Sequence, residues 1–302
     1  MLPRTSLPVA IALLAICGAR ADDSGYVRIN LTRNWQNHMI APVRLNGRNA
    51  HLIVDTGAMF SCLDLAKERS FGFRPEKGTV VMVNGRKHGA ARIDSVGIGP
   101  VEIRNLKMAL INASEYQTPR RSGEARVDGI LGLDVLRLGH AVIDCRHPRL
   151  FWKAVPGAPN VMAATLRAEG WTAVKLEFKD YLYFAKGTVN ETPARFLVDT
   201  GAFATLLDRN FAARAGLKAD GPRLRTKGIH HEDTQSRVAH PKTLAIGGLR
   251  LRNFPIAISA LHKPGLLDNT VSGLLGADVL GKNLGVIDCE QHVLYLKSPG
   301  ER

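Results

Sequence analysis

The chain has 302 residues, of which 45% are hydrophobic and 6% aromatic. This apolar content is enough for one large core or for two cores of about 100 to 150 residues each, and it excludes a disordered or collagen-like chain. Lys and Arg number 41 against 27 Asp and Glu, so the formal net charge is +14. Because the basic residues are scattered and form no tract with interleaved aromatic residues, the charge predicts a basic surface and no nucleic-acid partner.

The amino terminus has the pattern of a secretory signal peptide. A basic residue precedes an apolar run from Leu7 to Cys17, and Ala19-Arg20-Ala21 places small residues before a cleavage site near Ala21. The run of about 11 residues is shorter than the roughly 20 that span a bilayer. We therefore expect residues 1–21 to be a signal peptide, the protein to be periplasmic or secreted, and the mature chain to have no integral membrane segment. A lipid anchor on Cys17 is disfavoured, since the bulky Ile16 precedes it where a small residue is required.

An internal repeat with an offset of 144 residues organises the chain. Three separate blocks share this offset: Leu52–Ala58 with Phe196–Ala202, Val127–Leu136 with Val271–Leu280, and Val142–Cys145 with Val286–Cys289. The repeat predicts two homologous lobes joined head to tail. A stretch with two prolines and a glycine at 155–160 separates them, which predicts an N-terminal lobe at 24–156 and a C-terminal lobe at 161–302.

Most local patterns in both lobes are typical of strands. In chain order, the sequence predicts a strand at Tyr26 to Leu31, hairpin arms at Val43–Leu45 and His51–Val54 around the Asn46-Gly47 turn, a short helix from Asp64 to Arg69, an alternating strand at Arg92–Val96, a short helix at Leu133–Leu138, a strand at Leu249–Arg252 and a short helix at Ala277–Leu280. We therefore expect an all-β fold with a few short helices.

Removal of the signal peptide leaves three cysteines, Cys62, Cys145 and Cys289. The repeat makes Cys145 and Cys289 equivalent, so either a disulfide between the lobes or two buried free thiols would fit the sequence. Cys62 is expected to be a small core residue.

Asp55 and Asp199 are equivalent in the repeat, and each ends an apolar strand and is followed by Thr-Gly. If the lobes pack about an approximate two-fold axis, residues near the axis meet their own counterparts, so these two carboxyl groups would face each other. Two carboxyl groups in contact titrate as a pair and retain one proton at intermediate pH. Such a pair can take a proton from a bound water and donate one to a carbonyl oxygen, which is the chemistry of amide hydrolysis without a metal.

Two Asp-Thr-Gly-Ala tetrapeptides, at Asp55–Ala58 and Asp199–Ala202, are each followed by an apolar-apolar-Gly element, at Ile130–Gly132 and Leu274–Gly276. On these motifs the chain resembles the aspartic proteases, in the single-chain retropepsin-like form found among bacterial exported proteins. The resemblance covers essentially the whole mature chain. It implies two retropepsin-like lobes about an approximate two-fold axis, with Asp55 and Asp199 as the catalytic dyad.

The same resemblance implies supporting roles for residues beside the dyad. Thr56 and Thr200 should hydrogen-bond across the axis, and Gly57 and Gly201 should let backbone N–H groups approach the carboxylates. The remaining support positions complete the two loops or lie beneath them: Ala58, Ala202, Gly132 and Gly276.

This sequence departs from the family pattern at two pairs of positions. Ala58 and Ala202 stand where pepsin-like enzymes usually carry Ser, so a hydroxyl donor to the carboxylates is missing. Loss of that donor should raise the pKa values of the dyad and extend activity towards weakly acidic or neutral pH. Leu133 and Ala277 replace an Arg of viral retropepsins, so we expect the lobes to pack through other contacts.

Two turn-rich segments are candidates for the hairpin flaps that cover the dyad in this family. Position alone supports them, and ordinary surface hairpins are the alternative. Their tips are Asn84 and Gly85 in the first lobe and Gly228 and Ile229 in the second. Next to the second tip lies the run His230-His231-Glu232-Asp233. Its spacing matches no known set of metal ligands, so we predict that these are exposed loop residues and not a metal site.

Together these features predict an aspartic endopeptidase, a hydrolase that needs no cofactor, acts on a polypeptide substrate and works as a monomer because both catalytic loops lie in one chain. The alternative is a catalytically inactive module on the same fold that binds a peptide or an envelope polymer. Asp144 and Asp288 also repeat, but they precede hairpin-like turns, so we expect them to accept hydrogen bonds from the backbone rather than to act in catalysis.

Overall fold

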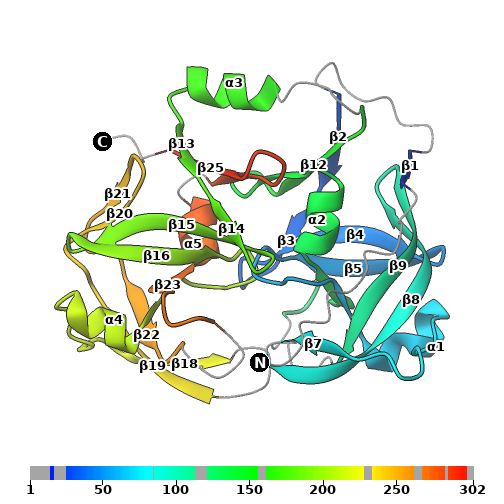
Figure 1. Ribbon diagram of the computed structural model, residues 1–302, viewed down its shortest axis with the longest axis horizontal. Coiled ribbons are helices and arrows are strands. Elements are labelled where there is room, and N and C mark those ends of the chain that lie inside the picture. Colours follow the sequence, from blue (N-terminus) through cyan, green and yellow to red (C-terminus); the bar gives the residue numbers. More distant parts are fainter. Residues whose placement is uncertain are drawn as a thin grey trace.

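The computed structural model describes residues 14–16, 25–83, 85–112, 121–155, 161–227, 233–261, 267–282 and 285–297. The chain forms two β-rich lobes side by side, with a third sheet across one end of both (Figure 1). This arrangement confirms the predicted fold class of two homologous all-β lobes with a few short helices. Among the described residues, no helix has the length and apolar character needed to cross a membrane.

The first lobe is built on a mixed sheet in the order β1-β9-β6-β10-β5-β4-β8-β7, with β3 paired to β4. Its strands are β1 (Leu14–Ile16), β3 (Thr32–Arg33), β4 (Met39–Leu45), β5 (Arg48–Val54), β6 (Cys62–Asp64), β7 (Val81–Val83), β8 (Arg86–Ile98), β9 (Val101–Ile111) and β10 (Gly129–Leu131). Its helices are the 3₁₀ turn η1 (Leu65–Lys67), α1 (Glu68–Phe71) and α2 (Leu133–Leu138). The predicted Asn46-Gly47 turn joins β4 to β5, and both of its residues have the positive φ that such a tight hairpin requires.

The second lobe repeats this plan in the order β18-β19-β22-β17-β23-β16-β15-β20-β21, with β14 paired to β15. Its strands are β14 (Glu177–Lys179), β15 (Leu182–Val189), β16 (Thr192–Val198), β17 (Leu206–Asp208), β18 (Arg223–Lys227), β19 (Asp233–Ala239), β20 (Leu244–Ile246), β21 (Leu249–Leu251), β22 (Ile256–Ser259) and β23 (Gly273–Leu275). Its helices are α4 (Arg209–Arg214) and α5 (Ala277–Lys282).

The repeat is visible in the strand register. In the first lobe, β10 lies parallel to β5 with Leu131 opposite Val54, and in the second β23 lies parallel to β16 with Leu275 opposite Val198. Both pairs keep the offset of 144 residues. Each Asp-Thr-Gly motif therefore leaves the end of a buried strand at the same place in its lobe.

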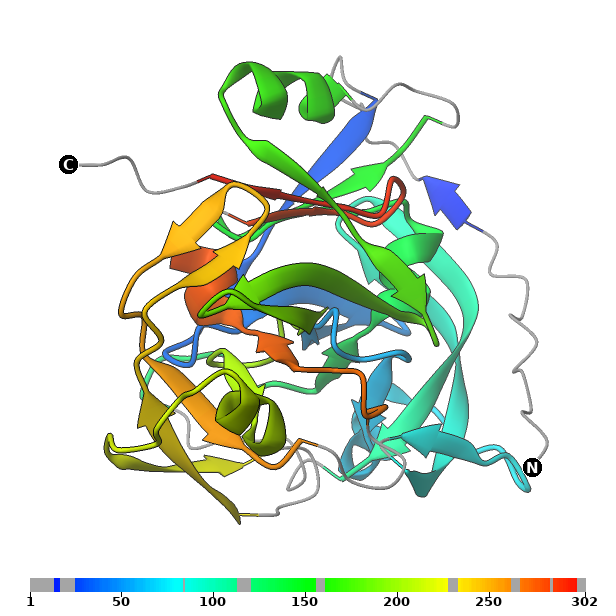
Figure 2. The ribbon, with the colours of Figure 1, turned by 60° about the vertical axis from the view of Figure 1, so that its left-hand side comes forward.

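The interlobe sheet runs in the order β13-β25-β24-β11-β12-β2 and takes strands from both halves of the chain (Figure 2). These strands are β2 (Tyr26–Asn30), β11 (Val142–Asp144), β12 (Arg149–Lys153), β13 (Thr172–Lys175), β24 (Val286–Asp288) and β25 (Val293–Leu296). At its centre β11 and β24 are antiparallel, and Ile143 lies directly opposite its own counterpart Ile287. The approximate two-fold axis therefore passes through this residue pair.

Alternation of side chains gives the interlobe sheet two apolar faces. Ile143 and Ile287 point into the main core, which is one continuous cluster of buried residues spanning both lobes. Val142 and Val286 point the other way, where Leu166 of α3 (Val161–Ala168) covers them. Since both faces are buried, the sheet joins the lobes through their cores.

The structure decides between the disulfide and the free thiols that the sequence left open. Cys145 and Cys289 are buried and free, as is Cys62. In the antiparallel pairing, the backbone N–H of Cys145 donates to the carbonyl of Gly285, and that of Cys289 donates to the carbonyl of Ala141. The two equivalent cysteines therefore lie on opposite sides of the axis. The predicted lobe boundary at 155–160 has its last five residues outside the described part of the chain and stays a prediction.

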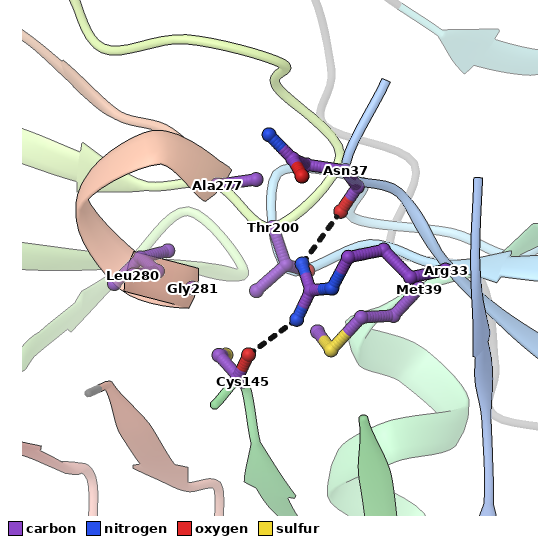
Figure 3. A pocket seen from close by; sticks show the side chains of 8 residues that line it. All are labelled: Arg33, Asn37, Met39, Cys145, Thr200, Ala277, Leu280 and Gly281. Atoms are coloured by element: carbon purple, nitrogen blue, oxygen red, sulfur yellow. Dashed lines mark hydrogen bonds between the residues drawn. The ribbon is translucent and has the colours of Figure 1, made fainter. Parts of the chain in front are cut away.

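Two arginines supply contacts between the lobes. The guanidinium group of Arg137 on α2 stacks on the ring of Phe178 in β14, 3.9 Å from its centroid. Arg33 at the end of β3 donates to the backbone oxygens of Asn37, at 3.0 Å, and of Cys145. Figure 3 shows that Arg33 reaches between Thr200 and Gly281, both from the second lobe.

Arg33 provides a test of the two hydrogen bonds that hold its guanidinium group beside the second lobe. Arg33→Met keeps most of the aliphatic stem but removes both hydrogen bonds, so we expect the free energy of unfolding to fall by about 2 kcal/mol, since hydrogen bonds to charged groups contribute roughly 1.5–3 kcal/mol. Denaturant unfolding measures the change. Arg28→Met, at an exposed position of β2, is the matched control and should change stability by less than about 0.5 kcal/mol. Equal unfolding midpoints for the two variants would show that these two hydrogen bonds do not stabilise the protein.

Candidate active site

The two Asp-Thr-Gly loops begin at equivalent strand ends and meet between the lobes. The backbone N–H of Asp55 donates to the carbonyl of Leu131, and that of Asp199 donates to the carbonyl of Leu275, each at 3.0 Å. These bonds tie each loop to the apolar-apolar-Gly strand beside it. The structure thus brings Asp55 and Asp199 together, as the repeat predicts.

Thr56 and Thr200 lock the two loops to each other. The backbone N–H of each threonine donates to the hydroxyl of the other, at 3.0 and 3.1 Å. Each hydroxyl in turn donates across the axis to a strand carbonyl, Thr56 to Val198 and Thr200 to Val54, both at 2.7 Å. Both side chains are fully buried, so the four bonds form without competition from solvent.

The glycines of the two loops leave room for the opposite carboxyl group. A Cβ on Gly57 would lie 2.5 Å from the Cγ of Asp199, and one on Gly201 would lie 2.4 Å from the Cγ of Asp55. The N–H of Gly57 donates to Asp55 Oδ1 at 2.8 Å, and that of Gly201 to Asp199 Oδ1 at 2.9 Å. No larger residue fits at either position without displacing the carboxyl groups.

The two carboxyl groups share a hydrogen bond and perturb each other's titration. Burial raises the pKa of Asp55, and hydrogen bonds from the backbone N–H groups of Gly57, Ala58 and Gly201 partly offset this increase. Burial and the nearby charge of Asp55 raise the pKa of Asp199 well above its ordinary value. One proton is therefore held between the two groups at a pH where exposed carboxyl groups are ionised. The backbone N–H groups of Ala58 and Ala202 act on the carboxylates even though these residues lack a hydroxyl.

A second layer of polar residues supports the loops from behind, and the sequence analysis assigned it no role. Asp134 Oδ1 accepts from the N–H and hydroxyl of Ser61, at 2.9 and 2.7 Å, and the Ser61 hydroxyl accepts from the N–H of Gly132. Asp278, Thr205 and Gly276 repeat this arrangement in the second lobe. The signal was present in the repeat, because Asp134 matches Asp278 and a hydroxyl residue lies six positions after each dyad Asp.

The downstream glycines pack directly beneath the loops. A Cβ on Gly132 would lie 2.7 Å from the backbone of Phe60, and one on Gly276 would lie 2.4 Å from the backbone of Ala204. The residues after these glycines close the loops, since Leu133 N–H donates to the carbonyl of Ala58 and Ala277 N–H to that of Ala202. All eight predicted support residues therefore contact one of the two loops or belong to it.

The candidate flaps are only partly described. In the first lobe, β7 and β8 pair up to Val83 and Arg86, and Gly85 in the turn has positive φ. In the second, β18 and β19 pair up to Lys227 and Asp233. Both hairpins lie at the end of the molecule opposite the interlobe sheet (Figure 1). The predicted tips Asn84, Gly228 and Ile229 lie outside the described residues.

Other candidate residues have structural roles. Asp144 accepts from two backbone N–H groups of the turn that follows it, and Asp288 does the same in the second lobe. The described part of the chain contains no cluster of three or more His, Cys, Asp or Glu side chains arranged to hold a metal. His230, His231 and Glu232 lie outside the described residues.

Comparison with known proteins agrees with this geometry. A family model described as aspartyl protease matches the chain twice, at residues 41–135 and 185–279. The fold is similar to that of an aspartic proteinase from Irpex lacteus, with 14% identity, a TM-score of 0.55 and coverage of 91% of this chain and 98% of that one. It is also similar to conglutin gamma, a basic 7S globulin from lupine seeds, with 10% identity, a TM-score of 0.52 and coverage of 91% and 95%. A search of curated proteins found no significant match.

The threonine network makes a direct stability prediction. Thr56→Val keeps the shape of the side chain but removes the hydroxyl from two buried hydrogen bonds. We expect the free energy of unfolding to fall by about 2–5 kcal/mol, since each buried partner left without a hydrogen bond costs about 1–3 kcal/mol. Thr56→Ser keeps the hydroxyl and serves as the control in denaturant unfolding. A valine variant as stable as the serine variant would rule out this role.

Asp134 predicts a pH dependence of stability. Burial raises its pKa to about 6, above the value of about 3.9 in an unfolded chain. The stabilisation from its protonation is complete below about pH 4 and is lost as the pH rises through about 6. Asp134→Asn keeps the Oδ1 acceptor but cannot titrate, so its stability should fall less between pH 4 and pH 7 than that of the wild type, by up to about 2–3 kcal/mol.

The measurement is denaturant unfolding at several pH values. Asp94→Asn, at an exposed strand position, is the control and should follow the wild-type curve. Parallel curves for Asp134→Asn and the wild type would show that Asp134 does not titrate in this range.

Proposed function

The chain belongs to the aspartyl protease family, and on this premise we propose that it is an aspartic endopeptidase, in which Asp55 and Asp199 activate a water molecule against a peptide bond. The observation that carries the proposal is the pair of hydrogen-bonded carboxyl groups, buried or half-buried and held by matching backbone donors on an axis of approximate symmetry.

The reaction follows from the shared proton. The ionised carboxylate accepts a proton from a water molecule as that water attacks the carbonyl carbon of the substrate. The protonated partner donates a hydrogen bond to the carbonyl oxygen and keeps its proton, which stabilises the negative charge that develops on that oxygen. The tetrahedral intermediate then breaks its C–N bond, and a carboxyl proton passes to the leaving nitrogen, which restores the dyad to its single-proton state.

The surroundings of the dyad suit this chemistry. The threonine bonds prevent the loops from moving independently, so the two carboxyl groups keep a fixed separation during the proton transfers. Since one chain supplies both loops, we propose that the enzyme acts as a monomer on a polypeptide substrate. Export to the periplasm or beyond remains part of the proposal and rests on the amino-terminal pattern alone.

The first experiment is cleavage of a diverse peptide mixture by the purified protein between about pH 3 and 8. Asp55→Asn and Asp199→Asn should each lower the rate at least about a hundredfold, because each removes one partner of the acid–base pair. Asp144→Asn is the matched control, since Asp144 also belongs to a repeated pair but its carboxylate accepts from backbone N–H groups of the turn that follows it. Cleavage that survives in both dyad variants would refute the proposal.

The raised pKa values predict where activity lies on the pH scale. Burial disfavours the charge and raises the pKa of Asp55, so we expect the acid limb of the rate profile to lie at a higher pH than an exposed carboxyl group would give. A profile confined below about pH 3 would contradict this expectation.

A binding measurement separates the enzyme from an inactive module on the same fold. Peptides in which a tetrahedral hydroxyl-bearing carbon replaces the scissile amide imitate the intermediate, so an enzyme should bind them at least about a hundredfold more tightly than the parent peptides. Equal affinity for both, together with no cleavage at any pH, would favour the binding module.

A further inference from the structure

Phe60 follows the first Asp-Thr-Gly loop and is half-buried. Together with Ala58 it packs on a small apolar cluster, separate from the main core, that contains Val81 of β7. Val83, at the end of β7 nearest the candidate flap tip, packs on the same cluster. Because side chains alternate along a strand, Val81 and Val83 share one face of β7, and Met82 lies on the other and is 48% exposed. The apolar face of the first candidate flap therefore lies against the loop that carries the dyad.

Tyr181 of the second lobe contacts Phe60. The centroids of the two rings lie 6.3 Å apart, and their planes are inclined by 36°. Tyr181 belongs to the two-residue turn between β14 and β15 and is 50% exposed. This hairpin reaches from the second lobe to the boundary between the lobes (Figure 1). Phe60 and Tyr181 therefore form one partly exposed aromatic surface to which both lobes contribute.

Phe178 of β14 supports the ring of Tyr181. The two rings meet edge to face, with centroids 6.1 Å apart and planes at 82°. Phe178 is itself surrounded, because the guanidinium group of Arg137 stacks on it and the rings of Tyr183 and His292 lie 5.4 and 5.3 Å away. The aromatic surface is thus in place before any ligand arrives, which lowers the entropy cost of binding to it.

The backbone at Tyr181 is unusual for an aromatic residue. Asp180 and Tyr181 have φ values of 50° and 60°, and a two-residue hairpin turn of this kind requires positive φ at both positions. Gly, Asn and Asp suit such positions, whereas a bulky side chain there is strained. Residues kept in a strained backbone conformation cluster at functional sites. The strain at Tyr181 therefore points to a function for its side chain.

The repeat does not reproduce the aromatic pair. By the offset of 144 residues, Tyr181 matches Asn37, which also has positive φ, at 61°, and Phe60 matches Ala204. The two rings therefore border the first Asp-Thr-Gly loop, and an amide and a methyl group take their places beside the second. Since the dyad lies on the axis, an extended substrate that crosses it meets this aromatic surface on one side of the scissile bond.

Resting on the function proposed above, we propose that Phe60, Val83 and Tyr181 form a subsite for one large apolar side chain of the polypeptide substrate, aromatic by preference. The surface is continuous with the loop that carries Asp55 and with the apolar face of the candidate flap, so its occupant is the chain that the dyad cleaves. An aromatic side chain fits best, because rings stack offset or edge to face on other rings.

The cut sites of the wild type in a diverse peptide mixture test this subsite. We expect Phe, Tyr, Trp or Leu to be enriched at one fixed position, on one side of the cleaved bond. Two synthetic peptides that differ only by Phe or Ala at that position then give a ratio of kcat/KM values. Tyr181→Asn copies the counterpart Asn37 and suits the positive φ, so it should fold. It should lower this ratio at least about tenfold, since apolar contacts in a pocket are worth about 10–200-fold, and change cleavage of the Ala peptide less than about threefold.

Two further variants serve as controls. Tyr181→Phe keeps the ring and should keep the ratio within about threefold of the wild-type value. Phe203→Ala removes a ring that is also 50% exposed but follows the second Asp-Thr-Gly loop, so the preference at this position should stay unchanged. Cut sites without aromatic enrichment would overturn the proposal. So would a preference that survives in Tyr181→Asn or that disappears equally in Phe203→Ala.

A binding measurement does not depend on peptide cleavage. Fluorescence anisotropy compares a labelled octapeptide of Ser and Ala with one that carries a single central Phe, using protein with Asp199→Asn to prevent turnover. We expect the Phe peptide to bind about tenfold more tightly, and Tyr181→Asn in the same protein to abolish the difference. Equal affinity for the two peptides would overturn the subsite. If the wild type cleaves nothing while the difference holds, the proposed function fails but the subsite stands. If it cleaves with no aromatic preference, the subsite fails and the proposed function stands.

Discussion

The hydrogen bonds that Thr56 and Thr200 exchange across the approximate two-fold axis are the constraint on which the rest of the structure depends. Each hydroxyl accepts from the opposite loop and donates to the opposite strand, so neither loop can be in place unless the other is. Hydrogen bonds tolerate only a few tenths of an ångström, so the lobes must be joined rigidly elsewhere. The interlobe sheet provides this rigidity by running through both cores, with Ile143 and Ile287 meeting on the axis.

The same constraint explains how two carboxyl groups can be kept close together with little access to water. Burial disfavours their charge, and proximity disfavours a second charge, so the pair retains a proton. Backbone N–H groups satisfy the ionised member, and glycine is required where each loop passes the opposite carboxyl group. Behind the loops, Asp134 and Asp278 use their own carboxylates to hold Ser61 and Thr205. The site is thus two layers deep, and the outer layer is positioned by hydrogen bonds rather than by packing alone.

A single chain also frees the two halves to differ, and they do differ where the lobes touch. Arg137 stacks on Phe178 at one contact, whereas its counterpart Gly281 leaves room for Arg33 at the other. In a dimer of identical chains, every such residue and its charge would occur at both contacts. The internal repeat is therefore symmetric at the dyad and asymmetric at the surrounding contacts between the lobes, where one residue at each contact is sufficient.

The sequence by itself determined the lobes, the strand-rich fold and the dyad, because an offset of 144 residues exposes equivalent positions whatever their surroundings. The Asn46-Gly47 hairpin and the short helix after Gly132 were also predictable, since turn and helix signals are local. Only the tertiary structure decided what lies beside the dyad. Arg33 carries no motif, and its importance arises from its place beside Thr200 and Gly281, more than 160 residues away. The free state of Cys145 and Cys289 likewise follows from the antiparallel register, which separates the equivalent residues on either side of the axis. Contacts between distant segments depend on how the lobes pack, and local sequence patterns do not record that packing.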